Sequence, residues 1–192
     1  LLLNEQNGVM KKDYQLLADK TALGLVMQSV GIPMVETSCV SKGDYHDLIL
    51  ALQKDAALFC KLRSGSRGES AFRVEKNTIG MSGQTLAGHN LHNEHNIRLA
   101  WQELTRKGEV LIQPYMQNHP LLESLDSEVM TLRVITRLTE TGIATWFGFL
   151  YVQVPGDKID REYWLLSVDL NSGLLCDAFD HWNTKQAIQT NQ

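Results

Sequence analysis

Apolar residues recur at helical spacing soon after the start of the chain. In residues 20–30 they fall three or four positions apart, which is typical of a helix with one buried side. Asp19 directly precedes this segment and is a favourable N-cap. Gly31 is expected to end the helix. Pro33 favours an extended backbone, so a strand is predicted through Val35.

Two further segments show the same spacing. The first begins at Gly43-Asp44, and the second covers residues 91–107, with Gly108 as its end. The apolar residues of these two predicted helices are Tyr45, Leu48, Ile49, Leu52, Ile97, Ala100, Trp101 and Leu104. We expect the helices to bury this side.

Short apolar runs between the helices predict strands. Residues 57–61 and 71–74 are expected to pair antiparallel across a tight glycine loop, and residues 110–113 predict a buried strand. Residues 77–90 contain Gly80, Gly83 and Gly88 and predict a mobile loop.

The second half of the chain predicts mainly strands. They cover residues 131–139, 143–154 and 164–170 and a last run ending at Phe179, with turns at 140–142 and 171–173. Aromatic residues occupy both faces of the second of these strands and predict burial on both sides: Trp146, Phe147, Phe149 and Tyr151. Early helices and late strands favour an α+β fold with two lobes, residues 1–112 and 113–192.

Composition excludes several classes of protein. The 192 residues are 43% apolar and 21% charged, as in globular proteins, and the net charge of −4 comes without a basic cluster for non-specific nucleic-acid binding. The chain has no apolar stretch of the roughly 20 residues that a membrane helix needs. Its three cysteines form no CxxC pair, which favours a reducing, cytoplasmic setting. The N-terminus does not resemble a signal peptide and lacks Met, which fits a piece of a longer protein.

The strongest chemical signal is Lys61 followed by Ser64-Gly65-Ser66-Arg67-Gly68. Small residues allow successive backbone N–H groups to converge on an anion, and a lysine at the end of the preceding strand can reach the same phosphates. In a Walker A loop and in a kinase glycine loop the lysine follows the glycines instead, so the order here argues against both. The alternative is an exposed hairpin with an incidental lysine.

Further motifs accompany this loop in a fixed order. They are Asp19-Lys20, Gly31-Ile32-Pro33, Val110-Leu111-Ile112-Gln113-Pro114-Tyr115-Met116 and Thr131-Leu132-Arg133. In this order and spacing, over about residues 15–173, the chain resembles the ATP-grasp superfamily, and most of all its sugar-transfer-associated branch, which is found near polysaccharide genes.

The resemblance implies ATP and Mg²⁺ between two lobes with antiparallel sheets. Lys20 and Lys61 would contact the α- and β-phosphates, and the loop Ser64, Gly65, Ser66, Arg67 and Gly68 would close over them. The segment Gln113 to Met116 would be a hinge, where backbone groups of Pro114 and of Met116 or Tyr115 read the adenine edge. Many members carry a glutamate where this chain has Gln113-Pro114. Glu123 and Asp126 are equal candidates for the ribose hydroxyls.

Arg133 is the candidate catalytic residue. Alternation along the strand from Thr131 places Leu132, Val134 and Leu138 on a core face and Arg133 and Arg137 on the other face. An arginine there can stabilise a transferring phosphoryl group, and the alternative is a solvated sheet face. The resemblance favours a function for Arg133 but not for Arg137.

No metal ligands are assigned by the sequence. His89, His92 and His95 lack a carboxylate or cysteine to complete a site, so a polar surface is expected there. The family's Glu-x-Asn pair has no counterpart late in the chain, although Glu5-Gln6-Asn7 and Glu75-Lys76-Asn77 share its spacing. Asp169-Leu170-Asn171 is predicted to form a hairpin turn instead. The implied fold therefore ends before its metal-binding strand.

Three interpretations follow. The first is the ATP-binding part of a carboxylate–amine ligase that forms an acyl phosphate. The second is an ATP-binding or regulatory module without catalysis, and the third is an unrelated α+β protein. The sequence does not identify the carboxylate, the amine or the oligomeric state.

Overall fold

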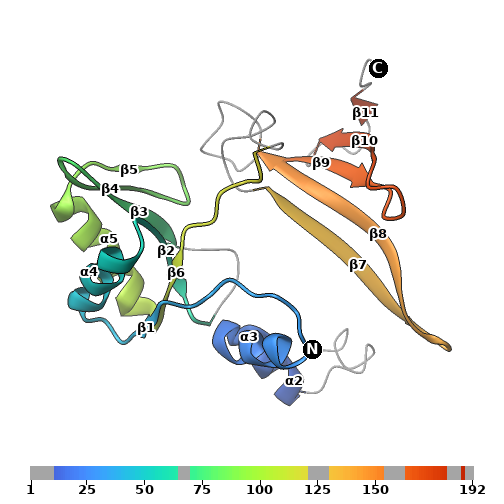
Figure 1. Cartoon of the computed structure of the whole chain (residues 1–192), viewed down its shortest axis with the longest axis horizontal. Coiled ribbons are helices and arrows are strands. Elements are labelled where there is room, and N and C mark those ends of the chain that lie inside the picture. The colour runs from blue at the N-terminus through green and yellow to red at the C-terminus, as the bar shows by residue number, and fades with distance from the viewer. Residues whose placement is uncertain (1–10, 65–69, 121–129, 154–162, 181–186, 189–192) are drawn as a thin grey trace. The chain divides into compact units, whose positions relative to one another are not determined.

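The computed structural model describes residues 11–64, 70–120, 130–153, 163–180 and 187–188 (Figure 1). The chain divides into two compact units, Leu1–Tyr115 and Met116–Gln192. Both helices and antiparallel sheets are present, so the α+β prediction is confirmed at that level. Among the described residues, no helix is long and apolar enough to cross a membrane.

The described residues of the first unit form a six-stranded antiparallel sheet and four helices. The sheet order is β1-β6-β2-β3-β4-β5. The strands are β1 (Cys39–Ser41), β2 (Ala57–Leu62), β3 (Phe72–Asn77), β4 (Gly80–Thr85), β5 (Asn90–Leu91) and β6 (Val110–Pro114). The helices are α2 (Lys11–Ala18), α3 (Lys20–Ser29), α4 (Tyr45–Lys54) and α5 (Glu94–Lys107).

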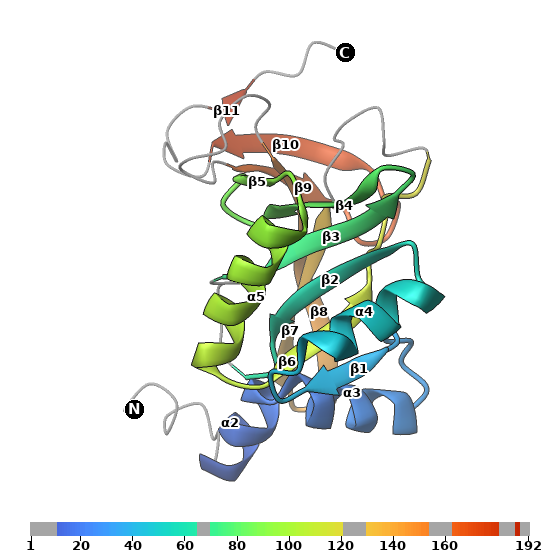
Figure 2. The same ribbon diagram turned by 90° about the vertical axis from the view of Figure 1, so that its left-hand side faces the viewer.

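Helices α4 and α5 cover one face of this sheet (Figure 2). Their buried residues Leu48, Ala51, Leu52, Ile97, Trp101 and Leu104 pack on alternate residues of the strands, among them Leu58, Cys60, Phe72, Val74, Val110 and Ile112. Side chains alternate along a strand, so the neighbouring residues of β2 lie on the opposite face. The core is therefore built between the helices and one side of the sheet.

The predicted helix starts follow from side-chain caps. Asp19 accepts hydrogen bonds from the backbone N–H groups of Thr21 and Ala22, which confirms it as the N-cap of α3. Asp44 caps α4 in the same way. The third predicted helix, α5, begins at Glu94 and not at Leu91 as predicted, because Asn93 is its N-cap.

Two local predictions were wrong. Residues 32–38 form no strand, and the first strand is Cys39–Ser41, which pairs with β6. Residues 77–90 contain strand β4 in place of a loop. A Cβ at Gly83 would lie 2.3 Å from the Arg73 carbonyl oxygen, so this glycine allows β3 and β4 to approach closely.

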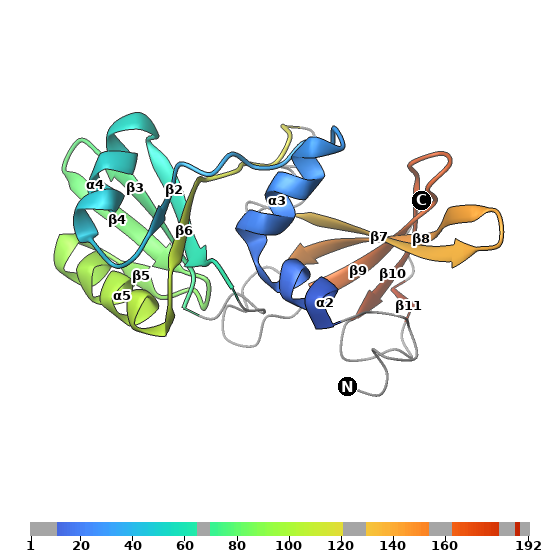
Figure 3. The same cartoon turned by 90° about the horizontal axis from the view of Figure 1, so that it is seen from below.

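In the second unit, the residues that the structure describes form a five-stranded antiparallel sheet in the order β11-β10-β9-β8-β7. The strands are β7 (Thr131–Thr139), β8 (Gly142–Gln153), β9 (Tyr163–Val168), β10 (Leu175–Asp180) and β11 (Ala187–Ile188). Figure 3 shows β7 and β8 joined in a long hairpin, and its turn at Gly142 has a positive φ of 127°, which glycine adopts at little cost.

The burial predicted for this hairpin was wrong in part. Leu132, Val134 and Leu138 are 51%, 43% and 83% exposed, and Trp146 is 62% exposed. Leu150 and Val152 are buried, and Phe147, Phe149 and Tyr151 are half-buried. Leu132 pairs in register with Leu150, so the face that these residues share is buried on β8 and exposed on β7.

Candidate functional site

Strand β2 presents Lys61 on the sheet face that α4 and α5 leave uncovered. Leu58 and Cys60 are fully buried on the helix face, so alternation turns Phe59 and Lys61 to the other side. Lys61 pairs in register with Leu111 of β6, which is 1% exposed. The lysine therefore rises from a well-packed position at the end of its strand.

Lys61 is half-buried as a residue. Burial lowers the pKa of Lys61, and the positive charge of Lys20 lowers it further. Burial also lowers the pKa of Lys20, against the opposing effect of Asp19. Among the described residues Lys61 has no ion pair, and its Nζ lies 5.8 Å from the centre of the Phe59 ring. Two cations that repel each other at a half-buried position favour an anion between them.

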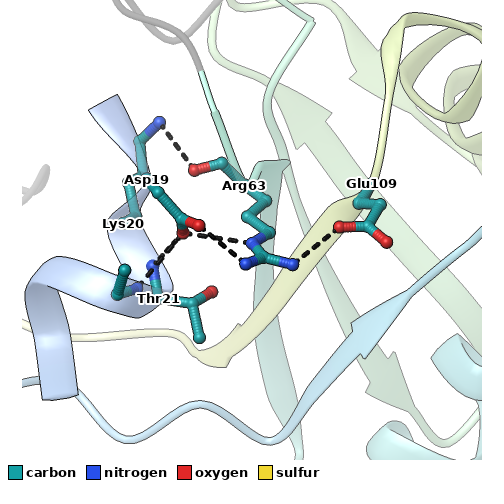
Figure 4. A network of polar contacts seen from close by, with 6 residues as sticks. Asp19, Lys20, Thr21, Arg63 and Glu109 are labelled. Atoms are coloured by element: carbon teal, nitrogen blue, oxygen red, sulfur yellow. Dashed lines mark hydrogen bonds and ion pairs between the residues drawn. The ribbon is translucent and has the colours of Figure 1, made fainter. Parts of the chain in front are cut away.

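Lys20 reaches this position because the start of α3 is joined to the end of β2 (Figure 4). The backbone N–H of Lys20 donates to the Arg63 carbonyl at 3.1 Å, and its Nζ lies 3.5 Å from the same oxygen. Asp19 also forms an isolated antiparallel bridge with Ser64. The motif Asp19-Lys20 and the segment after Lys61 are thus brought together.

Arg63 is a residue of this site that sequence reasoning did not single out. Its Nε and Nη2 donate to the two carboxylate oxygens of Asp19, at 3.0 and 2.6 Å. Its Nη1 donates to Glu109 Oε2 at 2.8 Å. These bonds lower the pKa of Asp19 to about 2, with the Arg63 hydrogen bonds as the largest cause. In the sequence, the one feature that pointed to Arg63 was its position two residues after Lys61, which places both side chains on the same side of the chain if the strand continues.

The remainder of the glycine loop, Gly65, Ser66, Arg67 and Gly68, lies outside the described residues. Ser64 is described and exposed. The structure therefore places the two ends of the predicted phosphate site, Lys61 and Ser64, and leaves the closing loop as a prediction.

The predicted hinge begins at the end of β6. Gln113 is 8% exposed, and its Nε2 donates to the Val35 carbonyl oxygen at 3.2 Å. The N–H of Tyr115 donates to the Ala57 carbonyl oxygen at 2.9 Å and is used within the sheet. Met116, the other residue considered beside Pro114 for adenine recognition, is 51% exposed, and the adenine contacts of this segment stay a prediction.

An aromatic and cationic group continues the same sheet face. Phe59 pairs in register with both Gln113 and Arg73. The Arg73 guanidinium lies 5.2 Å from the centre of the Tyr115 ring, and its Nη1 is 3.4 Å from the Tyr115 hydroxyl. Phe59 and Arg73 were missed by the sequence analysis, although alternation on β2 already placed Phe59 beside Lys61.

In the second unit, Arg133 lies on β7 with its guanidinium 4.9 Å from the Tyr151 ring. Arg137 has a similar position at 6.0 Å from the Trp146 ring. Both arginines are exposed. The cation–π contact gives Arg133 a local packing partner, and its catalytic role stays a prediction.

The remaining positions considered in the sequence are the three histidines, the turn at Asp169 and several acidic residues. His89, His92 and His95 are exposed, and no group of three metal-ligating side chains occurs in the part of the chain that the structure describes. Asp169 accepts from the N–H groups of Asn171 and Ser172, which confirms the hairpin turn. The residues outside the described ranges are Glu123, Asp126 and the segment Glu5-Gln6-Asn7.

The pair Glu75 and Asn77 also has a local structural explanation. Glu75 accepts a hydrogen bond from the Ser82 hydroxyl at 3.3 Å, and Asn77 accepts from the Ile79 N–H at 3.1 Å. Both side chains thus support the β3–β4 hairpin.

Comparison of the chain with protein-family models, with curated proteins and with solved structures found no match.

Proposed function

We propose that the first unit binds the phosphates of ATP between Lys20 and Lys61. The observation that carries this proposal is the placement of two lysines from distant parts of the chain. Lys20 Nζ lies 3.5 Å from the carbonyl oxygen of Arg63, just beyond the end of β2, and the positive charge of Lys20 lowers the pKa of the half-buried Lys61. A polyphosphate would relieve their repulsion and compensate for their burial. The aromatic Phe59 lies beside Lys61 on the same sheet face and offers a surface for the base.

Within this proposal the protein is the ATP-binding part of an ATP-grasp carboxylate–amine ligase. A carboxylate oxygen would attack the γ-phosphorus and release ADP. The nitrogen of an amine would then attack the acyl carbon, so that phosphate leaves, the amide bond forms and the amine loses a proton. Lysines that neutralise phosphate charge and an arginine such as Arg133 are the protein groups that this chemistry uses.

Mg²⁺ would enter with the nucleotide and neutralise part of its charge. None of the described residues is assigned to the metal, because Glu75, Asn77 and Asp169 are engaged in their own turns. The steps that the chain itself performs are therefore binding and orientation of the phosphates.

Isothermal titration of ATP with and without Mg²⁺ tests the proposal. We expect saturable binding that weakens at least about ten-fold, or about 1.4 kcal/mol, in Lys61→Ala. Lys76→Ala is the matched control, because this exposed lysine lies at the other end of the sheet, next to the residue paired with Ala57. Equal loss in both variants, or no binding by the unchanged protein, would overturn the proposal.

The effect of Mg²⁺ separates the ligase from the non-catalytic module. A ligase binds ATP more tightly with Mg²⁺, because its transferring phosphoryl group needs both metal and protein charges. A binding module that has lost metal ligands binds ATP equally well with and without Mg²⁺.

A further inference from the structure

We propose that Arg63 is a positioning residue, which holds Lys20 beside Lys61 by clamping Asp19 to Glu109. This inference rests on the proposed phosphate site and adds the element that assembles it. The clamp consists of Asp19, Arg63 and Glu109 (Figure 4).

The clamp joins three segments of the first unit. Asp19 precedes α3, Arg63 follows β2, and Glu109 precedes β6. Arg63 bonds Asp19 through two nitrogens and Glu109 through a third, with donor–acceptor distances of 2.6 to 3.0 Å. A planar guanidinium that bonds a carboxylate through two parallel N–H groups fixes the direction as well as the distance of its partner. Asp19 is therefore held in one orientation.

The orientation of Asp19 also determines the position of Lys20, because Asp19 caps the helix that begins at Lys20. Asp19 caps α3 through Oδ1, the oxygen that also accepts from Arg63 Nε, so one carboxylate sets both the start of the helix and its attachment to β2. The next residue along the chain is Lys20, whose N–H donates to the Arg63 carbonyl. The side chain and the backbone of Arg63 thus hold the same turn of α3 from two sides.

Direct phosphate binding by Arg63 is a different role, and the geometry argues against it. All three guanidinium nitrogens already donate to carboxylates. The net charge of the clamp is negative, because one guanidinium meets two carboxylates.

Because the clamp carries a negative charge, the clamp and simple electrostatics predict opposite changes in anion affinity for one substitution. Asp19→Asn removes a negative charge next to Lys20, so simple electrostatic attraction predicts tighter anion binding. Asparagine still caps a helix, so α3 keeps its start. If the clamp positions Lys20, the same substitution weakens anion binding, because the charge-assisted bonds to Arg63 are lost.

The experiment measures binding of inorganic tripolyphosphate to the full chain by isothermal titration. We expect Asp19→Asn and Arg63→Met each to weaken binding about five-fold to ten-fold, and Arg63→Lys to restore little, since lysine cannot form the two-nitrogen bond. In a Lys20→Ala background Arg63→Met should cause no further loss, because the clamp acts through Lys20. Far-ultraviolet circular dichroism and thermal unfolding confirm that each variant is folded.

The outcomes are distinguishable. Unchanged or tighter binding by Asp19→Asn, or additive losses in the Lys20→Ala background, overturns the clamp and leaves the phosphate site intact. Full retention of binding by Arg63→Lys would indicate that only the charge of Arg63 matters, and it also overturns the clamp. If the unchanged chain does not bind tripolyphosphate, the proposed function itself fails.

Discussion

Phe59 and Lys61 lie on the same side of β2, and the Lys61 ammonium is 5.8 Å from the centre of the Phe59 ring. The residues between and before them, Cys60 and Leu58, are fully buried on the helix face. An aromatic surface thus adjoins the cationic end of the strand, which is an arrangement suited to a ligand with a planar base at one end and phosphates at the other.

We expect Phe59→Leu to weaken ATP binding more than tripolyphosphate binding. Leucine keeps an apolar side chain at this half-buried position but removes the ring face, and base–aromatic stacking is worth about 1–3 kcal/mol. Parallel titrations with the two ligands measure the difference. An equal loss for both ligands would show that Phe59 acts only on Lys61, and Leu62→Met on the opposite face of β2 is a control for local packing.

Phosphate binding should be accompanied by proton uptake at alkaline pH. The pKa of Lys61 is lowered by burial and by Lys20, so this lysine loses its proton at a lower pH than an ordinary lysine. A bound anion favours the charged form and raises the pKa again, so affinity falls as the pH rises through the lowered pKa. Titrations at about pH 9 in buffers of different ionisation enthalpy count the protons taken up.

Lys20→Ala gives the control for this measurement. Removal of the Lys20 charge raises the pKa of Lys61 towards its ordinary value, so we expect smaller proton uptake at the same pH. Proton uptake that is unaffected by Lys20→Ala would mean that the two lysines do not share one site.

Two leucines of helix α5, one buried and one exposed, test how this helix packs in the first unit. Leu104 is fully buried and Leu99 is 50% exposed. Leu104→Ala should lower the free energy of unfolding by about 2–5 kcal/mol, because it leaves a cavity under the sheet. Leu99→Ala should change it by less than about 0.5 kcal/mol. Denaturant unfolding measures both, and similar losses would contradict the position of α5.

Two glycines provide a second matched pair. A Cβ at Gly83 would lie 2.3 Å from the Arg73 carbonyl oxygen, whereas a Cβ at Gly24 meets nothing within 4 Å. Gly83→Ala should therefore destabilise the β3–β4 pair, and Gly24→Ala should stabilise α3 by about 0.5–1 kcal/mol. Thermal unfolding of the two variants should shift in opposite directions. A common direction would contradict the close approach at Gly83.

Much of the local structure could be predicted from the sequence. Asp19 and Asp44 marked the starts of two helices, because their carboxylates accept the N–H groups that the first turn leaves unpaired. The limits of β7, residues 131–139, were also predicted. Alternation did not predict burial there, since Leu138 is 83% exposed.

Strand pairing was harder to predict than helix capping. The segment at Gly83 was interpreted as a loop because glycines weaken a strand pattern, but pairing with β3 stabilises β4 there. The segment after Pro33 forms no strand, and β1 begins only where Cys39 meets Ile112. A strand depends on a partner that is distant in the sequence, so local preference does not decide it.

The sequence by itself determined which residues carry charge and which side of its strand Lys61 occupies, because helical and strand periodicities are local properties of the chain. Only the tertiary structure decided that Lys20 and Lys61 are neighbours. That proximity depends on bonds between Asp19 and Arg63, which are 44 residues apart. No local pattern encodes such a bond, since its geometry exists only after α3 has packed against the end of β2.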